Sequence, residues 1–204
     1  MKLSDYIAEF LSKITDSVFV GQGGNIIHVL DSLGKRKDIK VIPSQNEQGA
    51  SIAADAYSRF NNKIGVTAAT SGPGMLNLMQ GMACSFFDSI PTFHFSGAVV
   101  TGQLRKNKKI RQIGFQEMEV VDLVKPITKY AVLLTDPETG RRIPPTRTRP
   151  VESSTFLPFQ GGGKRRHSFH LFFRACGVEI EDRVGWSGTS VSDKACLRTT
   201  RSLQ

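Results

Sequence analysis

The sequence predicts an α/β fold, a doubly wound, mostly parallel sheet with helices on both faces, followed by an irregular or disordered tail. Short β-prone runs alternate with helix-length amphipathic segments as far as residue 134, which is typical of βαβ units and a parallel sheet. Beyond residue 139 this alternation stops. We therefore expect one domain over residues 1–139 and a basic tail over residues 140–204.

Within residues 1–59 the sequence predicts three helices and two strands. Ser4 is expected to cap a helix whose apolar positions recur at helical spacing, Ile7, Phe10, Leu11 and Ile14. A buried strand over residues 18–20 runs into a glycine-rich turn, and the next helix ends at Gly34. A strand over residues 39–42 leads into an Ala-rich helix from about residue 45 to residue 59.

The second part predicts strands over residues 64–70, 92–96 and 128–134, with helical segments over residues 75–87 and 118–124. Asp136 looks like the start of a further helix, with Pro137 near its first position. Residues 101–113 break the pattern with five basic side chains. This stretch is either a mobile, solvated excursion or a lid or binding loop.

Composition narrows the class of protein. Residues 1–139 hold 15 basic and 13 acidic residues, whereas residues 140–204 hold 12 and 5, so the net charge of +9 lies mostly in the tail. This distribution makes nucleic acid an unlikely partner of the domain, and no apolar run is long enough to cross a membrane. Cys84, Cys176 and Cys196 form neither a CxxC pair nor an even disulfide set, and the N-terminus lacks a secretory pattern. We expect a cytoplasmic protein.

Two interpretations of Glu47 follow from spacing alone. Ser44 and Glu47 fit the S-x-x-E capping box, in which both side chains satisfy backbone N–H groups at a helix start. Glu47 would also lie at the carboxyl edge of the sheet, where open α/β folds bind ligands. The four histidines lack metal-ligand spacing, and His94, between two phenylalanines in a predicted strand, is expected to be structural.

Several segments together resemble a known family. They are N-E-Q-G-A-S-I-A-A-D-A-Y-S-R (46–59), T-S-G-P-G-M-L-N-L (70–78), F-F-D-S-I-P (86–91), S-G (96–97), R-Q-I-G-F-Q-E (111–117) and V-K-P-I-T-K (124–129). In this order, over about 135 residues, they resemble the N-terminal pyrimidine-binding domain of thiamine diphosphate (ThDP) enzymes, above all the acetolactate synthase-like group.

The resemblance implies a catalytic role for Glu47. In this family the corresponding carboxylate bonds to the ring nitrogen of the cofactor's aminopyrimidine and promotes its imino tautomer. Such a carboxylate must be held rigidly where water is excluded. The cofactor carries the chemistry, and the protein supplies orientation and electrostatics.

The resemblance also implies binding residues at the strand ends. Cofactor contacts are expected from Glu47 together with Gly21, Gly23, Ser71, Gly72, Asn77 and Gln80. Phe115 and Gln116 match a substrate-facing pair, although a solvated loop amide remains the alternative for Gln116. No metal ligand is expected within this chain, and Mg²⁺ is expected only with a diphosphate-binding domain.

The implied reaction is decarboxylation of a 2-keto acid with transfer of the acyl-anion unit. Asn46 stands where acetolactate synthases usually have His, so the acceptor stays open among an aldehyde, a second keto acid and a proton. The GDG…N motif of the diphosphate domain is not found in the sequence. We expect a fragment inactive alone, working as a homodimer or, alternatively, as one subunit of a split enzyme with a diphosphate-domain partner.

The tail does not resemble the family. Pro144 and Pro145 would break any helix continuing from residue 136, and Ser, Thr, Arg and Gly dominate the last thirty residues. A shifted reading frame near residues 139–140 explains the sudden change of composition. The competing interpretation is a genuine basic tail that binds RNA or an acidic surface.

Overall fold

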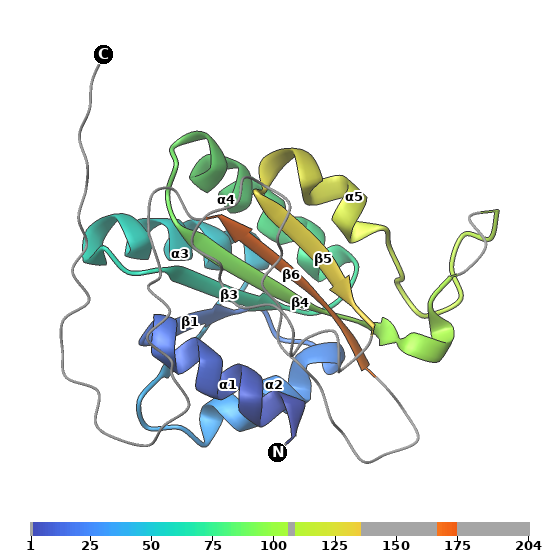
Figure 1. Cartoon of the computed structure of the whole chain (residues 1–204), viewed down its shortest axis with the longest axis horizontal. Helices are drawn as coiled ribbons and strands as arrows, with labels where there is room; N and C mark the ends of the chain where they lie inside the picture. Colours follow the sequence, from blue (N-terminus) through green and yellow to red (C-terminus); the bar gives the residue numbers. More distant parts are fainter. Residues whose placement is uncertain (1, 106–108, 136–166, 175–204) are drawn as a thin grey trace, which may run out of the picture.

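The computed structural model describes residues 2–105, 109–135 and 167–174. Six strands form one sheet in the order β2-β1-β3-β4-β6-β5 (Figure 1). The strands, in chain order, are β1 (Ser17–Val20), β2 (Lys40–Pro43), β3 (Gly65–Ala69), β4 (Thr92–Val100), β5 (Tyr130–Leu134) and β6 (His167–Arg174). The four strands β2, β1, β3 and β4 are mutually parallel, which confirms the predicted fold class.

Helices cover both faces of the sheet (Figure 1). They are α1 (Leu3–Ile14), α2 (Ile27–Gly34), α3 (Glu47–Asn61), α4 (Pro73–Phe87) and α5 (Val120–Val124), with short 3₁₀ turns η1 (Gly24–Ile26), η2 (Thr101–Gln103) and η3 (Lys125–Ile127). One core packs α1 and α2 against the sheet, and a second core lies among α3, α4 and α5. Side chains along β1 alternate between the two cores, as the pleat of a strand requires: Val18 and Val20 belong to the first and Phe19 packs against the second.

Small residues bring α3 and α4 close together, as the Ala-rich sequence predicts. Ala50 and Ala54 are fully buried on α3. A side chain added at Gly81 of α4 would come within 2.4 Å of the Ser51 hydroxyl oxygen on α3. The two helices are therefore in close contact, and both begin at the same edge of the sheet.

Two predicted helix caps are wrong. Ser4 lies inside α1 and is buried, and Lys2 occupies the N-cap position without a side-chain hydrogen bond. At α3 the N-cap is Asn46 rather than Ser44, and the helix begins at Glu47. The side-chain oxygen of Asn46 caps the helix in place of the capping box predicted from Ser44 and Glu47.

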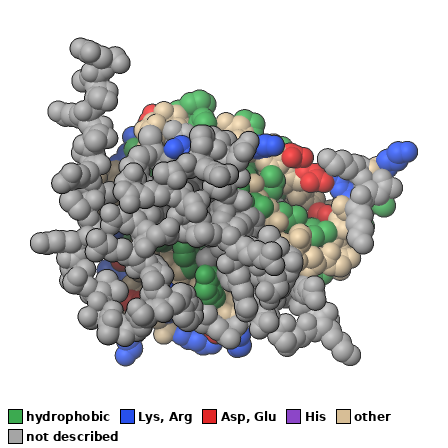
Figure 2. Space-filling model, viewed as in Figure 1, with side chains coloured by type: hydrophobic (Ala, Val, Ile, Leu, Met, Phe, Trp, Pro, Cys, Tyr) green, Lys and Arg blue, Asp and Glu red, His purple; other side chains and the backbone are tan. Residues whose placement is uncertain are grey.

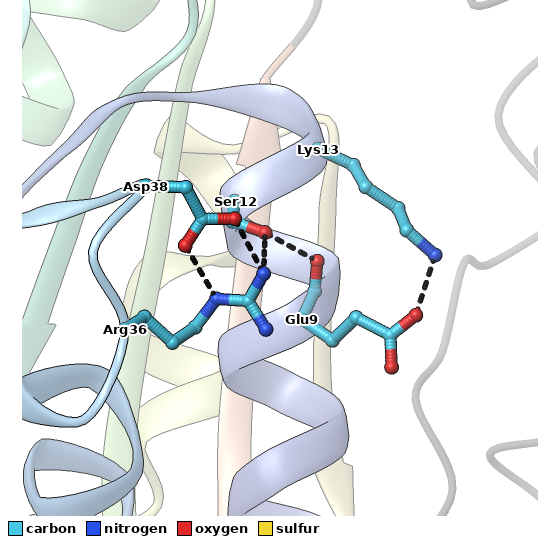
Figure 3. A network of polar contacts seen from close by, with 5 residues as sticks. All are labelled: Glu9, Ser12, Lys13, Arg36 and Asp38. Atoms are coloured by element: carbon cyan, nitrogen blue, oxygen red, sulfur yellow. Dashed lines mark hydrogen bonds and ion pairs between the residues drawn. The ribbon is translucent and has the colours of Figure 1, made fainter. Parts of the chain in front are cut away.

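Arg36, in the connection between α2 and β2, contacts α1. The Arg36 guanidinium donates from Nε and Nη2 to the two carboxylate oxygens of Asp38, at 2.8 and 2.5 Å (Figure 3). Its Nη2 also donates to the Ser12 hydroxyl on α1 at 2.8 Å, next to the Lys13–Glu9 ion pair. Arg36 thus ties the α2–β2 connection to α1.

One segment of the predicted tail is part of the sheet. Residues 167–174 form β6, which lies antiparallel between β4 and β5. The sequence here is H-S-F-H-L-F-F-R, which contains three Phe residues, a type enriched in strands. Outside the described residues lie the proposed helix start at Asp136, residues 140–166 and residues 175–204. The shifted reading frame near residues 139–140 remains a prediction.

Among the described residues, no helix is both long and apolar enough to cross a membrane.

Candidate active site

The carboxyl ends of β1, β2 and β3 bring together the residues singled out at the strand ends. Gly21 directly follows β1, and its backbone N–H donates to Ala68 of β3 at 2.8 Å. The chain after β2 enters α3 at Glu47, and the chain after β3 enters α4 through Ser71 and Gly72. Because parallel strands end at the same edge, these three connections meet there.

Glu47 extends from the first turn of α3 toward the turn after β1. A side chain added at Gly21 would meet Glu47 Cγ at 2.2 Å and Oε1 at 2.9 Å. The same Oε1 lies 3.2 Å from the Cβ position of Gly74 at the start of α4. Only glycine at Gly21 leaves room for this carboxylate, so Gly21 and Glu47 form one structural unit.

Asn77 holds the other carboxylate oxygen. Its Nδ2 donates to Glu47 Oε2 at 3.0 Å from one turn into α4. In the described part of the chain this is the only hydrogen bond to the Glu47 carboxylate. Glu47 is half-buried, and no hydrogen bond to its Oε1 is found among the described residues.

The capping interpretation of Glu47 is not what the structure shows. Asn46 Oδ1 accepts the Gln48 N–H at 2.7 Å, which satisfies an orphan donor at the start of α3. Glu47 is the first helical residue, and its carboxylate contacts Asn77 instead of the helix start. Asn46, which stands where acetolactate synthases usually have His, therefore has a structural role as the N-cap of α3.

The glycine-rich turn after β1 lies against the connection after β3. A side chain at Gly23 would come within 2.3 Å of Thr70 Cβ. Asn25 Nδ2 donates to the buried Ser71 hydroxyl at 2.5 Å, joining residues 46 positions apart. Asn25 thereby fixes the position of Ser71, one of the predicted cofactor residues.

Gly72 and Gln116 face each other at the next position along this edge. Gly72 has φ +61° and ψ −122°, a conformation that favours glycine. A side chain at Gly72 would lie 2.4 Å from the Gln116 carbonyl oxygen. Gln116 itself has φ +56°, and its neighbour Phe115 is 79% exposed, so the predicted substrate-facing pair lies beside the predicted cofactor residues.

Gln80 lies further along α4 than Asn77. Its side-chain oxygen accepts a hydrogen bond from Gln48 of α3. Gln80 and Asn77 are both exposed on α4, so the structure places them on the helix pair rather than deep at the strand ends.

Sequence reasoning missed three residues that contact this site. Thr70 precedes the Ser71–Gly72 turn, Gly74 lies in the first turn of α4, and Asn25 follows the glycines that come after β1. Thr70 and Gly74 belong to the T-S-G-P-G segment that carries the resemblance, so a signal for them existed. Asn25 offers none, since its partner is distant in sequence.

A pocket of about 380 Å³ extends from the Ser71–Gly72 turn toward α5 and β5. Val99, Val120 and Val132 are among its apolar lining residues, and Arg105 and Gln116 are among the polar ones. Glu47 is not among the residues that line this pocket, whereas Ser71, Gly72 and Gln116 are.

His94 is structural, as predicted. Its two ring nitrogens lie 2.7 Å from the Thr67 hydroxyl and 3.0 Å from the Thr92 hydroxyl, in the buried interior of β3 and β4. Burial lowers the pKa of His94 to about 3, although the negative charge of Asp55 opposes this shift. The ring is therefore neutral at physiological pH.

No group of three or more His, Cys, Asp and Glu side chains that could hold a metal ion is found in the parts of the chain that the structure describes.

Comparison with known proteins gives the same family as the motifs. The family described as "Thiamine pyrophosphate enzyme, N-terminal TPP binding domain" matches residues 1–123. The acetolactate synthase large subunit of Porphyra purpurea is 38% identical over 129 residues, covering 62% of this chain and 21% of that protein. The chloroplastic acetolactate synthase of Arabidopsis thaliana is 32% identical over 161 residues, covering 78% of this chain and 22% of that protein.

Acetolactate synthase 2, chloroplastic, of Brassica napus is 34% identical over 141 residues, or 69% of this chain. The chain spans about a fifth of the length of these relatives. With a family match over more than half of its residues, the chain belongs to the thiamine pyrophosphate enzymes and contains their N-terminal cofactor-binding domain.

Proposed function

We propose that this chain binds the aminopyrimidine end of ThDP through Glu47 and supplies one half of an active site for 2-keto acid decarboxylation and acyl-anion transfer. The observation that carries the proposal is the position of the Glu47 carboxylate. It is not used to cap α3, it occupies the space that Gly21 leaves open, and one oxygen has no described partner.

The residues present fit the aminopyrimidine group. A carboxylate can share a proton with a ring nitrogen if its orientation is fixed, and Asn77 fixes Glu47 from the side of Oε2. Gly21 and Gly74 keep the approach to Oε1 free of side chains. Ser71 and Gly72, at the next strand end, would face the same ring.

Bound ThDP supplies the carbon nucleophile that attacks the keto group. Glu47 would hold the proton at the pyrimidine ring nitrogen, and the backbone around Gly21 and Gly72 would orient that ring. Phe115 and Gln116 would face the substrate from the side of Gly72. The donor keto acid and its acceptor are not assigned by these contacts.

The second half of the site would come from a diphosphate-binding domain, together with Mg²⁺. Glu47 is only half-buried here, whereas a shared proton requires that water be excluded, so another surface must cover the carboxylate.

Two arrangements supply that domain. A homodimer of a longer polypeptide that carries both domains is one arrangement, and a separate diphosphate-domain polypeptide, as in a split enzyme, is the other. The sequence-based expectation of a cytoplasmic setting remains a prediction.

Calorimetry with ThDP and Mg²⁺ tests the proposal. The purified chain is titrated alone and after mixing with a diphosphate-domain protein of this family. We expect tight binding only in the mixture, and we expect Glu47→Gln to abolish it, because an amide cannot share the proton in the same way. Glu9→Gln is the matched control, since Glu9 lies on α1 and pairs with Lys13.

Undiminished ThDP binding by Glu47→Gln in the mixture would refute the role of Glu47. Equal losses in both variants would point to general unfolding. No binding by the wild-type mixture would remove the proposed half-site altogether.

A further inference from the structure

The loop between η2 and α5 is closed by one carboxylate. Glu117 Oε1 accepts the backbone N–H of Arg105, and Glu117 Oε2 accepts the backbone N–H of Ile113 at 3.0 Å. Arg105 is at the start of the loop and Ile113 near its end. A single side chain therefore bonds to both limbs through charge-assisted hydrogen bonds, which are stronger than neutral ones.

Arg105 fills the inside of this loop. Its Nη1 donates to the carbonyl oxygens of Ile110 and Arg111 at 2.8 and 3.4 Å, and its Nη2 pairs with Glu119 at 2.7 Å. Only 15% of the Arg105 side chain is exposed. Figure 2 shows acidic and basic side chains together at the end of the molecule where this loop extends in Figure 1.

The end of the loop is anchored on the sheet. Gly114 N–H donates to the Gln103 carbonyl at 3.1 Å, and Glu117 N–H donates to the Gly114 carbonyl at 3.2 Å. A side chain at Gly114 would lie 2.6 Å from Val99 Cβ of β4. Gly114 thus lies directly against the end of β4.

Phe115 and Gln116 stand between these two anchors. With Gly114 fixed against β4 and Glu117 bonded to both limbs, the two intervening residues have little freedom. Gln116 adopts φ +56°, which is uncommon for a residue with a side chain, and its carbonyl lies against Gly72. The surrounding contacts hold this unfavourable conformation.

We propose that Glu117 is a positioning residue: by bonding to both limbs of the loop it fixes Phe115 and Gln116 beside Gly72. The importance of that position for catalysis rests on the proposed function. The two hydrogen bonds between Glu117 and the backbone N–H groups of Arg105 and Ile113, here called the Glu117 brace, are a property of the chain itself. The loop is then a preformed wall of the site. For Arg105 and residues 109–113 this favours a binding loop over a mobile excursion, and residues 106–108 lie outside the described residues.

Nuclear magnetic resonance on the full chain, without cofactor, tests the brace. In the wild type we expect slow hydrogen exchange at the Arg105 and Ile113 amides, and a cross-relaxation signal between the backbone protons of Gly72 and Gln116. Glu117→Ala removes both acceptors, so both amides should exchange at least tenfold faster and the Gly72–Gln116 signal should disappear. Signals from β1 and β3 should stay unchanged.

Two further variants separate positioning from general stability. Glu117→Gln keeps one acceptor oxygen and should rescue protection at one of the two amides. Glu119→Gln is the matched control, because it loses the ion pair to Arg105 but leaves the brace, so the Gly72–Gln116 signal should persist.

Unchanged exchange at both amides in Glu117→Ala, or an intact Gly72–Gln116 signal, would overturn the proposal. So would equal losses in Glu119→Gln. Because no cofactor is present, these outcomes do not depend on whether ThDP binds, and failure of ThDP binding would leave the brace intact.

Discussion

Because His94 is buried, we expect the free energy of unfolding to fall in mild acid. The pKa of His94 in the folded chain is lowered to about 3 because burial disfavours the imidazolium. An unfolded histidine has a pKa of about 6.5. Below that value the unfolded chain binds a proton that the folded chain does not, so the free energy of unfolding falls as the pH falls.

The magnitude follows from proton linkage. Well below the unfolded pKa the loss approaches about 1.4 kcal/mol per pH unit, and between pH 7 and pH 5 it sums to about 2 kcal/mol. Carboxylates with a lowered pKa lose their contribution to stability only at a lower pH than this. Asp16, whose pKa is lowered to about 2 chiefly by its hydrogen bond from Lys63, loses its contribution only when the pH falls below its ordinary value of 3.8.

Urea denaturation of the wild type and of His94→Gln at pH 7, 6 and 5 measures this effect. Gln can still bond to the Thr67 and Thr92 hydroxyls but does not titrate in this range. We expect the wild type to lose about 2 kcal/mol more than the variant between pH 7 and pH 5. Parallel curves for the two proteins would refute the assignment of this pH dependence to His94.

Two further predictions test local structure. Asn46→Ala should lower the free energy of unfolding by about 1 kcal/mol because it removes the cap of α3, whereas Ser44→Ala should change it by much less; equal effects in thermal denaturation would contradict the assignment of the cap. Gly21→Ala should push the Glu47 side chain away, since the new Cβ would lie 2.2 Å from Glu47 Cγ, and should weaken ThDP binding in the reconstituted mixture at least tenfold in calorimetry with far-ultraviolet circular dichroism unchanged. Wild-type affinity in Gly21→Ala would mean that this close contact does not matter for the cofactor.

The parallel part of the sheet was predictable because short apolar strands alternate with amphipathic helices. Burial on both faces makes parallel strands apolar, and α1, α3 and α4 show helical spacing over three or more turns. The start of α3 was harder, because Ser44 and Asn46 are both good N-cap residues two positions apart. Spacing could not choose between them, and the choice decides whether Glu47 is a capping residue or a free carboxylate.

Contacts between distant residues left no pattern to find. Asn25 and Ser71 are 46 positions apart, and the Arg105–Glu117 bond joins two limbs of an irregular loop. Neither pair has a characteristic spacing, since nothing periodic connects them. β6 was missed for a different reason: a single short β-prone run gives no sign of which strands it will join, or in which direction.

The buried polar groups around His94 and the polar groups at the carboxyl edge of the sheet differ in a way that bears on function. Around His94 the buried polar groups are satisfied: the ring bonds to two threonines, and the buried Asp55 accepts bonds from Ser85 and Arg59. Such a network stabilises the fold and leaves no group for a ligand.

At the carboxyl edge the structure is arranged differently. Gly21 leaves a space that Glu47 enters, Gly72 and Gln116 hold positive φ angles, and Glu47 Oε1 has no described hydrogen bond. The left-handed φ of Gln116 costs stability, and such a conformation persists where the surrounding structure holds it in place for another purpose. Because all of these features meet at one edge, and the Glu117 brace holds the loop that completes that edge, we expect variants there to lose cofactor binding before they lose the fold.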